Sequence, residues 1–365
     1  MKKSNGFLSL FFGLILLFSL GVFDLSIPDF TVSAASVSAG EAVMEMTSGR
    51  VLFEKNAKQK LPMASTTKIL TAIIIIEDCN LLDKIKIPAE GVGIEGSSVY
   101  LKAGEEYTVK QLLYGLMLRS GNDCAVTLAL HHSGSIEAFA EVMNERSRAW
   151  GATHSNFKNP HGLPNEEHYT TAVDLAKISC HAMQNPVFQE IVSTKFFDEN
   201  GWLNKNKMLS MYDGANGIKT GYTIKAGRCL VTGAQRNGMQ LVCVVLNSPE
   251  MYERSAELLD GAFRKYSMQK LYAAEQEFII PTDVENKSCT LKSQNDFYYP
   301  LSQKEKAEVK YELPQSIRLP VNKGENKGKV NIYLENQLIF SENLCTIKDV
   351  RKSFADCLKE VMRNF

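Results

Sequence analysis

The chain has 365 residues, and its 41 Lys and Arg are balanced by 41 Asp and Glu, so the formal net charge is zero. This balance argues against a nucleic-acid-binding protein that works through a bulk positive field. The apolar fraction of 44% and the charged fraction of 22% are typical of globular proteins and exclude a disordered or fibrous chain. The length predicts two domains. Eight cysteines without a C-x-x-C pair indicate neither a disulfide scaffold nor a zinc or redox motif.

The first 35 residues have the layout of a secretory signal peptide. Lys2 and Lys3 form a basic start, no charged residue occurs between Phe7 and Phe23, and small residues follow in the segment 31–36. We therefore expect residues 1–35 to be a signal peptide, cleaved between Ala34 and Ala39, and the mature protein to be exported. The alternative is a retained transmembrane anchor, for which the apolar stretch is short.

Residues 36–270 are expected to form one domain with strands near both of its ends. Residues 41–46 and 50–54 predict a hairpin around Thr47-Ser48-Gly49. Residues 229–235 and 240–247 predict two buried strands joined at Asn237-Gly238, a strong hairpin signal. Ser248-Pro249-Glu250 then predicts a helix that runs to about Tyr266, with Ser248 as its N-cap. Strands at both ends with helices between them indicate an α+β fold.

The last quarter of the chain has a different pattern. Residues 308–313 and 330–334 alternate apolar and polar side chains, so residues 275–345 are expected to form a small β-rich domain. Residues 346–365 predict an amphipathic helix, because its apolar residues share one helical face. These residues are Ile347, Val350, Phe354, Cys357, Leu358, Val361, Met362 and Phe365. Such a helix either binds a membrane surface or closes the second domain, and both readings stay open.

Three short motifs carry the candidate chemistry. Ser65-Thr66-Thr67-Lys68 places a serine and a lysine one helical turn apart, and a lysine with a lowered pKa can take the proton of a serine hydroxyl. Ser120-Gly121-Asn122 opens a helical stretch, and Lys219-Thr220-Gly221 precedes the two hydrophobic strands. The Lys219 segment is expected to place an ammonium group and a hydroxyl along a strand edge that can bind a carboxylate.

Each motif alone is weak, but the ordered set S-x-x-K, S-x-N and K-T-G is the signature of penicillin-binding proteins and serine β-lactamases. The chain resembles the low-molecular-mass penicillin-binding proteins, which are serine D-Ala-D-Ala carboxypeptidases. The resemblance covers about residues 36 to 260 and extends to several segments around the motifs. These segments are 61–68, 96–104, 112–125, 159–163 and 214–227.

The resemblance implies a β-lactamase/transpeptidase-like catalytic domain, with an antiparallel sheet, flanking helices and a helical subdomain, followed by a β-rich accessory domain. It implies that Ser65 is the acylated nucleophile and Lys68 its general base. By the same resemblance, Ser120 relays protons and Asn122 holds the substrate amide. No metal or organic cofactor is implied.

The K-T-G segment is implied to bind substrate. Lys219 would supply positive charge near the terminal carboxylate, Thr220 would donate a hydrogen bond to it, and Gly221 would let the strand pass close by. The backbone N–H groups of Ser65 and Tyr222 would form the oxyanion hole. The implied substrates are peptidoglycan stem peptides at the cell envelope, and β-lactam antibiotics would acylate Ser65.

Other functions can be weighed against this one. A serine β-lactamase of class A needs a carboxylate in an E-x-x-L-N context, which the segment 166–170 lacks. A non-catalytic β-lactam sensor or wall-binding protein is disfavoured because the motif side chains are intact. A transpeptidase would differ only in its acceptor. The G-x-G-x-x-G string at 91–96 lacks a surrounding βαβ unit, and His131-His132 lacks further ligands at metal spacing.

Three further residues near the motifs have secondary interpretations. Lys205 lies in a segment that resembles one carrying a basic substrate contact in the family. His161 is expected to have a structural role rather than a catalytic one. Cys124 is expected to behave as a buried hydrophobic residue, and we expect mostly unpaired thiols in the chain as a whole.

Overall fold

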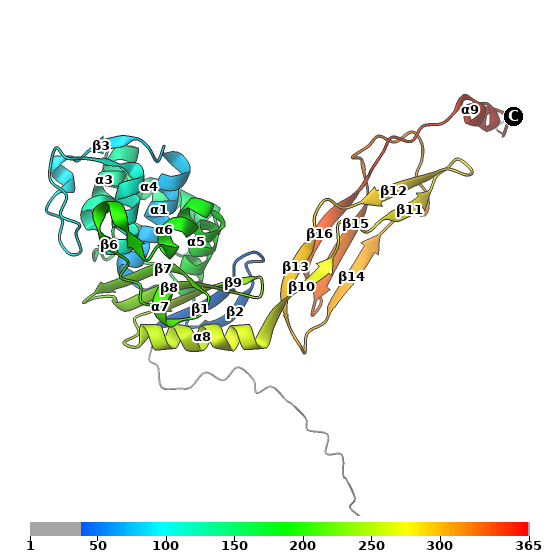
Figure 1. Cartoon of the computed structure of the whole chain (residues 1–365). Coiled ribbons are helices and arrows are strands. Elements are labelled where there is room, and N and C mark those ends of the chain that lie inside the picture. Colours follow the sequence, from blue (N-terminus) through cyan, green and yellow to red (C-terminus); the bar gives the residue numbers. More distant parts are fainter. Residues whose placement is uncertain (1–37, 364–365) are drawn as a thin grey trace, which may run out of the picture. The chain divides into compact units, whose positions relative to one another are not determined.

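The computed structural model describes residues 38–363, so the expected signal peptide of residues 1–35 lies outside the described part. Within it, the two ends of the α+β part meet in one antiparallel five-stranded sheet (Figure 1). The sheet has the order β2-β1-β9-β8-β7, and Ala42 at its start pairs with Val244 near its end. Its strands are β1 (Gly40–Glu45), β2 (Val51–Lys55), β7 (Ala215–Thr223), β8 (Gly227–Arg236) and β9 (Met239–Leu246).

The sheet is covered by helices on both faces. All eight residues of β9 are buried, as expected for a strand sandwiched between two layers. Helix α8 (Met251–Lys265) lies along one face, and α5 (Ala172–Gln184) lies on the other with α1 and α6 (Figure 1). Asn237 and Gly238 both have positive φ angles, 49° and 77°, so the predicted Asn-Gly hairpin joins β8 to β9.

The helical subdomain is built around α1 (Lys68–Asp78). This helix is buried from Lys68 through Ile75, and a helix that is apolar on all sides belongs in a core. The other helices of this part are α2 (Val109–Tyr114), α3 (Asn122–Ser133), α4 (Ile136–Ala149), α6 (Pro186–Ser193) and the short α7 (Met208–Met211). Shorter elements are η1 (Ala64–Thr67), β3 (Lys84–Lys86), η2 (Ala89–Gly91), β4 (Glu106–Thr108), the π-helical turn η3 (Gly115–Arg119), β5 (Phe196–Phe197), η4 (Asp198–Asn200) and β6 (Trp202–Leu203).

The β-rich part has a hydrophobic core of its own, which includes Leu291, Ile332 and Leu344. Its five-stranded sheet has the order β11-β12-β16-β15-β14, and β10 pairs with β13 in a second, two-stranded sheet. The strands are β10 (Tyr266–Tyr272), β11 (Phe278–Pro281), β12 (Ser288–Lys292), β13 (Phe297–Ser302), β14 (Ala307–Glu312), β15 (Asn326–Leu334) and β16 (Gln337–Thr346).

Two element boundaries differ from the sequence-based expectation. The expected bounds place residues 266–270 in the first domain, but Tyr266–Tyr272 forms β10 and pairs with β13, so the β-rich part begins at the end of α8 rather than near residue 275. Helix α8 begins at Met251 with Glu250 at its N-cap, two residues later than Ser248 suggested.

The C-terminal helix is shorter than the expected 346–365. Helix α9 spans Phe354–Arg363, because the residues before it are held by the β-rich part. Thr346 ends strand β16, and Val350 exchanges two backbone hydrogen bonds with Val321. Ser353 then caps the helix by accepting the backbone N–H of Asp356.

A buried ion pair ties the first strand to the last helix of the α+β part. Arg254 on α8 donates to both carboxylate oxygens of Glu41 on β1, at 2.7 Å each, and both side chains are almost completely buried. Because β1 and α8 lie 213 residues apart in sequence, this bidentate contact fixes the closure of the domain.

We predict that Arg254→Met lowers the free energy of unfolding by about 3–5 kcal/mol, since it leaves the Glu41 carboxylate buried without its partner. Urea unfolding followed by tryptophan fluorescence measures this, because Trp150 and Trp202 both lie in the α+β part. Lys102→Ala, which removes an exposed ion pair with Glu105, is the control and should cost less than about 1 kcal/mol. Equal losses of unfolding free energy in the two variants would contradict the stabilising role of the ion pair between Glu41 and Arg254.

Candidate active site

Ser65 lies in a strained turn at the head of the core helix. The turn η1 precedes α1 directly, and Ala64 has a φ of 49°, in the left-handed region that residues with a Cβ rarely adopt. The neighbouring hydroxyls fold back onto the chain: Thr66 donates to the carbonyl of Met63 at 2.6 Å, and Thr67 donates to that of Ala64 at 2.9 Å. The half-buried Ser65 is thus presented by a turn that its neighbours stabilise.

Lys68 is the first residue of α1 and has no exposed surface. Its Nζ donates to Ser65 Oγ at 3.1 Å, to Asn122 Oδ1 at 2.6 Å and to the carbonyl oxygen of His161 at 2.8 Å. Burial, followed by the positive charge of Lys219, lowers the pKa of Lys68 well below its usual value. A neutral amine within hydrogen-bond reach of a serine hydroxyl can act as its general base.

Ser120 and Asn122 lie between the turn η3 and helix α3. Ser120 has a φ of 66°, so the chain reverses sharply there before α3 begins at Asn122. The Asn122 amide nitrogen donates to the carbonyl of Glu95, while the amide oxygen accepts a hydrogen bond from Lys68 Nζ. Asn122 therefore orients Lys68 from a second helix.

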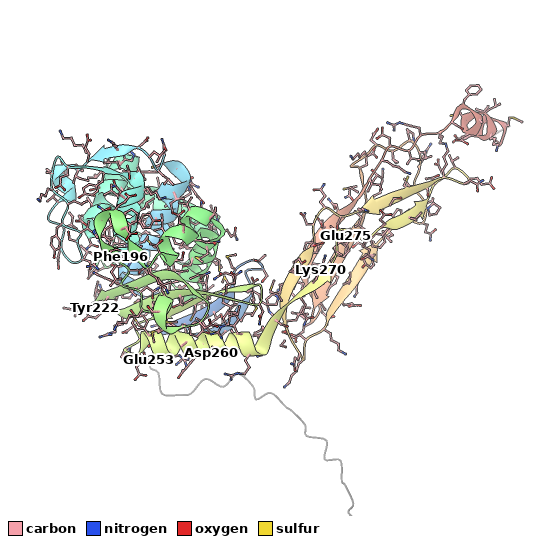
Figure 2. The ribbon with its side chains drawn as sticks, in the orientation of Figure 1. Phe196, Tyr222, Glu253, Asp260, Lys270 and Glu275 are labelled. Carbon is pink, nitrogen blue, oxygen red and sulfur yellow. The ribbon has the colours of Figure 1, made fainter. Side chains whose placement is uncertain are left out.

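Lys219 lies within β7, the edge strand of the sheet, which precedes the two hydrophobic strands β8 and β9 in the chain. Its side chain is 1% exposed, and its Nζ donates to the carbonyl of Thr220 at 2.9 Å. Burial and the charge of Lys205 lower the pKa of Lys219 to about 7. Thr220 is half-buried beside it, and Tyr222 near the end of the strand is 64% exposed (Figure 2).

Gly221 brings this edge strand against the turn that holds Ser65. A Cβ placed on Gly221 would lie 3.0 Å from the backbone nitrogen of Ser65 and 3.1 Å from the carbonyl oxygen of Met63. The close approach explains why a glycine stands there. The structure thus brings Ser65, Lys68, Asn122 and the β7 edge together.

Several contributors to the site were not predicted from the sequence. The buried Asp123 carboxylate accepts hydrogen bonds from Ser98 Oγ at 2.6 Å and from the backbone N–H of Val99 and Leu101, so it fixes the loop beside Asn122. An acidic residue in the first turn of α3 was the available signal. The backbone carbonyl of His161 accepts a hydrogen bond from Lys68, and the positive charge of Lys68 adds to the effect of burial on the pKa of the His161 ring. Burial lowers the pKa of the His161 ring to about 3, which fits the expected structural role.

The structure also shows the surroundings of Lys205 and Cys124, the other two residues that the sequence places near the motifs. Lys205 lowers the pKa of Lys219, and its backbone N–H donates to the carbonyl of Leu118 just before Ser120. Burial raises the pKa of Cys124 well above that of a free thiol, so it behaves as a buried hydrophobic residue. All eight cysteines lie in the described part, and none of them is paired.

The segment 91–96 and the pair His131-His132 have the following surroundings in the described part of the chain. Gly91 ends the 3-10 helix η2, and residues 92–96 form the loop that follows it, not a strand-to-helix turn. The ring of His132 contacts Asp78 at 3.1 Å, and the described residues contain no cluster of three or more metal-ligating side chains.

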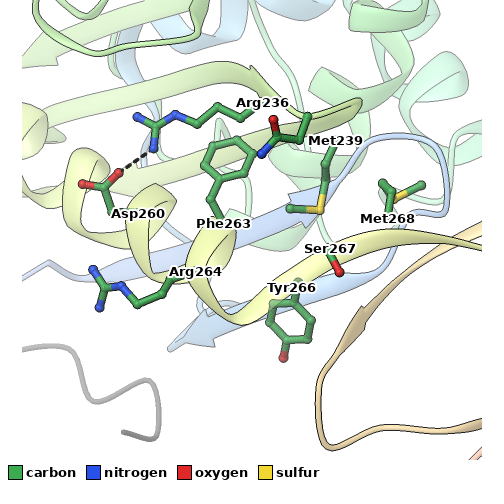
Figure 3. Close-up of a pocket in the computed structure, with 9 residues that line it drawn as sticks. Arg236, Met239, Asp260, Phe263, Arg264, Tyr266, Ser267 and Met268 are labelled. Carbon is green, nitrogen blue, oxygen red and sulfur yellow. Dashed lines mark hydrogen bonds and ion pairs between the residues drawn. The ribbon is translucent and has the colours of Figure 1, made fainter. Parts of the chain in front are cut away.

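A cavity of about 530 Å³ lies where α8 runs into β10 (Figure 3). Arg236 and Asp260 in its wall form an ion pair at 3.0 Å, and Phe263 and Met268 add apolar surface. None of the motif residues is among those that line it. The cavity is therefore separate from the cluster around Ser65.

Comparison with known proteins agrees with this fold. The family model for D-alanyl-D-alanine carboxypeptidases matches residues 29–250, and the model for the C-terminal domain of penicillin-binding protein 5 matches residues 266–352. The chain is 30% identical over 360 residues to the D-alanyl-D-alanine carboxypeptidase DacF of Bacillus subtilis, with 91% of each chain covered. It is 30% identical over 348 residues to DacC of Escherichia coli, covering 88% of this chain and 86% of that one.

Among solved structures, penicillin-binding protein 5 of Haemophilus influenzae matches with a TM-score of 0.74 and 27% identity, covering 88% of this chain and 100% of that one. The fold is therefore that of the penicillin-binding serine peptidases, with a β-rich C-terminal domain. The chain belongs to the D-alanyl-D-alanine carboxypeptidase family. The alternatives of a β-lactamase or a non-catalytic sensor are not favoured.

We predict that KM for a peptide with a free terminal carboxylate rises above about pH 7, because Lys219 loses its positive charge as the pH rises through its pKa of about 7. In Lys219→Arg the guanidinium stays charged, so the rise should move up by at least about two pH units. Lys219→Gln should show a high KM that does not change with pH. An identical alkaline rise in the wild type and in Lys219→Arg would contradict this.

Proposed function

We propose that this enzyme removes the terminal D-alanine from peptidoglycan stem peptides that end in D-Ala-D-Ala, through an acyl-enzyme on Ser65. The observation that carries the proposal is the buried Lys68 amine at 3.1 Å from Ser65 Oγ. Burial and the charge of Lys219 lower the pKa of Lys68, so the amine can accept the Ser65 proton at the moment of attack.

Acylation follows from this arrangement. Ser65 Oγ attacks the carbonyl carbon between the two D-alanines while its proton moves to Lys68 Nζ. The oxygen that becomes negative is stabilised by the backbone N–H groups of Ser65 and Tyr222, a role supported by the close approach of Gly221 to the Ser65 nitrogen. The proton then passes to the leaving amine by way of the Ser120 hydroxyl, the C–N bond breaks, and D-alanine departs.

Deacylation uses the same groups in reverse. A water molecule attacks the ester carbonyl, gives its proton to the Lys68 amine, and the proton returns to Ser65 Oγ as the ester bond breaks. The products are a stem peptide shortened by one residue and the free enzyme. A β-lactam would acylate Ser65 with opening of its ring, so no fragment leaves and the site stays blocked.

Substrate orientation depends on the edge strand β7. The terminal carboxylate would lie beside Lys219 and accept a hydrogen bond from the Thr220 hydroxyl. The peptide backbone would follow the strand past Gly221, with Asn122 holding its amide. Lys205 adds positive charge to the same region, since it shifts the pKa of Lys219.

We predict that Ser65→Ala lowers D-alanine release from a D-Ala-D-Ala peptide by about a thousandfold or more and abolishes labelling by fluorescent penicillin. Ser155→Ala is the matched control, because Ser155 belongs to the other S-x-x-K string of the chain, Ser155-Asn156-Phe157-Lys158, and should keep both activities. Activity retained in Ser65→Ala would contradict the site assignment, and labelling of the wild type without D-alanine release would contradict the reaction.

We further infer that the enzyme is exported and bound to a membrane surface through α9. The polar side of this helix is tied to the β-rich part by ion pairs from Lys287 to Asp356 at 2.6 Å and from Lys352 to Asp283 and Glu360. Its apolar side is left to solvent. The exposed fractions are 86% for Phe354, 53% for Leu358, 54% for Val361 and 70% for Met362.

An exposed apolar helix face of this kind is typical of a segment that lies in a membrane interface. Residues 345–365 contain five Lys or Arg and three Asp or Glu, so their net charge of +2 suits an anionic surface. In the part that the structure describes, no helix is long and apolar enough to cross a bilayer.

We predict that residues 36–365 co-sediment with anionic phospholipid vesicles, and that Phe354→Ser with Leu358→Ser weakens binding at least about tenfold, because two apolar side chains no longer enter the lipid. Leu338→Ser is the control, since Leu338 is also half-exposed but lies on a strand of the β-rich part. Equal binding of all three proteins, or none by the wild type, would contradict the inference.

A further inference from the structure

The loop of residues 156–170 wraps around the turn that holds Ser65. Its C-terminal end is fixed by Thr170, which exchanges two backbone hydrogen bonds with Leu61, and its two ends pair through Asn156 and Tyr169. Between these points it supplies the His161 carbonyl to Lys68, and the carbonyl of Pro160 accepts the Thr71 hydroxyl of α1 at 2.7 Å. The loop therefore contacts the S-x-x-K helix along its first turn.

His168 connects this loop to the nucleophile turn. Its side chain is almost completely buried, and its Nδ1 accepts the backbone N–H of Lys158 at 3.0 Å. An accepting Nδ1 leaves the proton of the neutral ring on Nε2, which lies 2.8 Å from Thr67 Oγ1. The ring also packs edge-on against Phe157, with centroids 5.8 Å apart. Both ring nitrogens of His168 therefore form hydrogen bonds, and these bonds fix the neutral ring in one tautomer.

The hydrogen bonds continue from Thr67 to the strained residue before Ser65. Because Thr67 Oγ1 accepts from His168, its own proton goes to the carbonyl of Ala64 at 2.9 Å. Ala64 has a φ of 49°, a conformation that persists only where the surroundings impose it. The loop backbone passes close to the same carbonyl at Gly162, since a Cβ on Gly162 would lie 1.9 Å from the Ala64 oxygen.

We propose that His168 is a positioning residue for acylation, which holds the left-handed turn at Ala64 through Thr67 and so fixes the direction of the Ser65 side chain. The inference rests on the proposed function, because it assigns His168 to the step in which Ser65 attacks. Burial lowers the pKa of His168 to about 4, so the ring is neutral near pH 7. The neutral ring keeps the tautomer required by the hydrogen-bond relay, which runs from His168 through Thr67 to the Ala64 carbonyl.

The test compares variants that break the relay with variants that keep it. His168→Phe keeps a ring of similar volume and removes both hydrogen bonds, whereas His168→Gln retains one donor and one acceptor. Thr67→Val removes the relay hydroxyl without changing side-chain shape, and Thr67→Ser keeps it. The acylation rate constant with fluorescent penicillin, kcat and KM for a D-Ala-D-Ala peptide, and the melting temperature are measured for each.

We expect His168→Phe and Thr67→Val each to lower the acylation rate constant and kcat about tenfold, with KM changed less than twofold. His168→Gln and Thr67→Ser should stay within about threefold of the wild type. The double variant of His168→Phe and Thr67→Val should be no slower than the slower single variant, because both break one relay. His131→Phe, an exposed histidine on α3, is the control and should match the wild type.

Wild-type acylation in both relay-breaking variants would overturn the proposal, as would fully multiplicative losses in the double variant. A loss in His168→Gln equal to that in His168→Phe would also overturn it, since ring volume rather than hydrogen bonding would then matter. If His168→Phe does not fold, Thr67→Val against Thr67→Ser decides alone. The Ser65→Ala variant distinguishes the proposed function from the role of His168. Retained penicillin labelling in Ser65→Ala would refute the proposed function. Wild-type acylation in the relay-breaking variants, with labelling lost in Ser65→Ala, would refute only the role of His168.

Discussion

The burial of one lysine amine is the constraint on which the rest of this structure depends. Lys68 has no exposed surface, and its partners are a hydroxyl, an amide oxygen and a backbone carbonyl rather than a carboxylate. An ammonium group in such surroundings loses its hydration without a hydrogen-bonded carboxylate, and the more distant charge of Asp123 does not offset burial and Lys219, so the pKa of Lys68 is lowered. The same burial that would destabilise a structural lysine therefore supplies the base that a serine nucleophile needs.

The fold can be understood as the means of surrounding that amine. Helix α1 is buried along most of its length, so its first residue lies inside the molecule, and α3 and the loop of residues 156–170 approach from two further directions. The edge strand β7 closes the remaining side, and Gly221 lets its backbone approach the Ser65 nitrogen. Closure of the five-stranded sheet joins β7 to strands from the start of the chain, and the buried pair of Glu41 and Arg254 fixes this closure.

Much of this arrangement could be predicted because it depends on local sequence. The S-x-x-K, S-x-N and K-T-G strings, the Asn237-Gly238 turn and the buried strand β9 each carry a signal within a few residues. The expected catalytic and β-rich parts follow from changes in hydrophobic periodicity. The placement of Ser65, Lys68 and Asn122 within hydrogen-bond reach agrees with the chemistry that the motif order implied.

Features that depend on distant partners could not be predicted in this way. No local pattern marks His168, because its contact with Thr67 joins residues 101 positions apart. Ile347 and Val350 have the spacing of a helix face, but neither is helical. The backbone of Ile347 donates to Thr290 and that of Val350 pairs with Val321, and these hydrogen bonds hold the segment against the β-rich part. Strand β10 continues directly from α8, and only its pairing with β13 assigns it to the β-rich part.

The most direct test of this account is the titration of the Lys68 amine in the free enzyme. The side-chain carbon next to the amine can be followed by NMR in protein with isotope-labelled lysine, and its signal can be assigned by its loss in Lys68→Arg. We expect the pKa of Lys68 to be well below 10.5, lowered by burial and by Lys219. A Lys68 pKa at or above 10.5 would mean that the amine is charged when Ser65 attacks, and it would contradict the central claim.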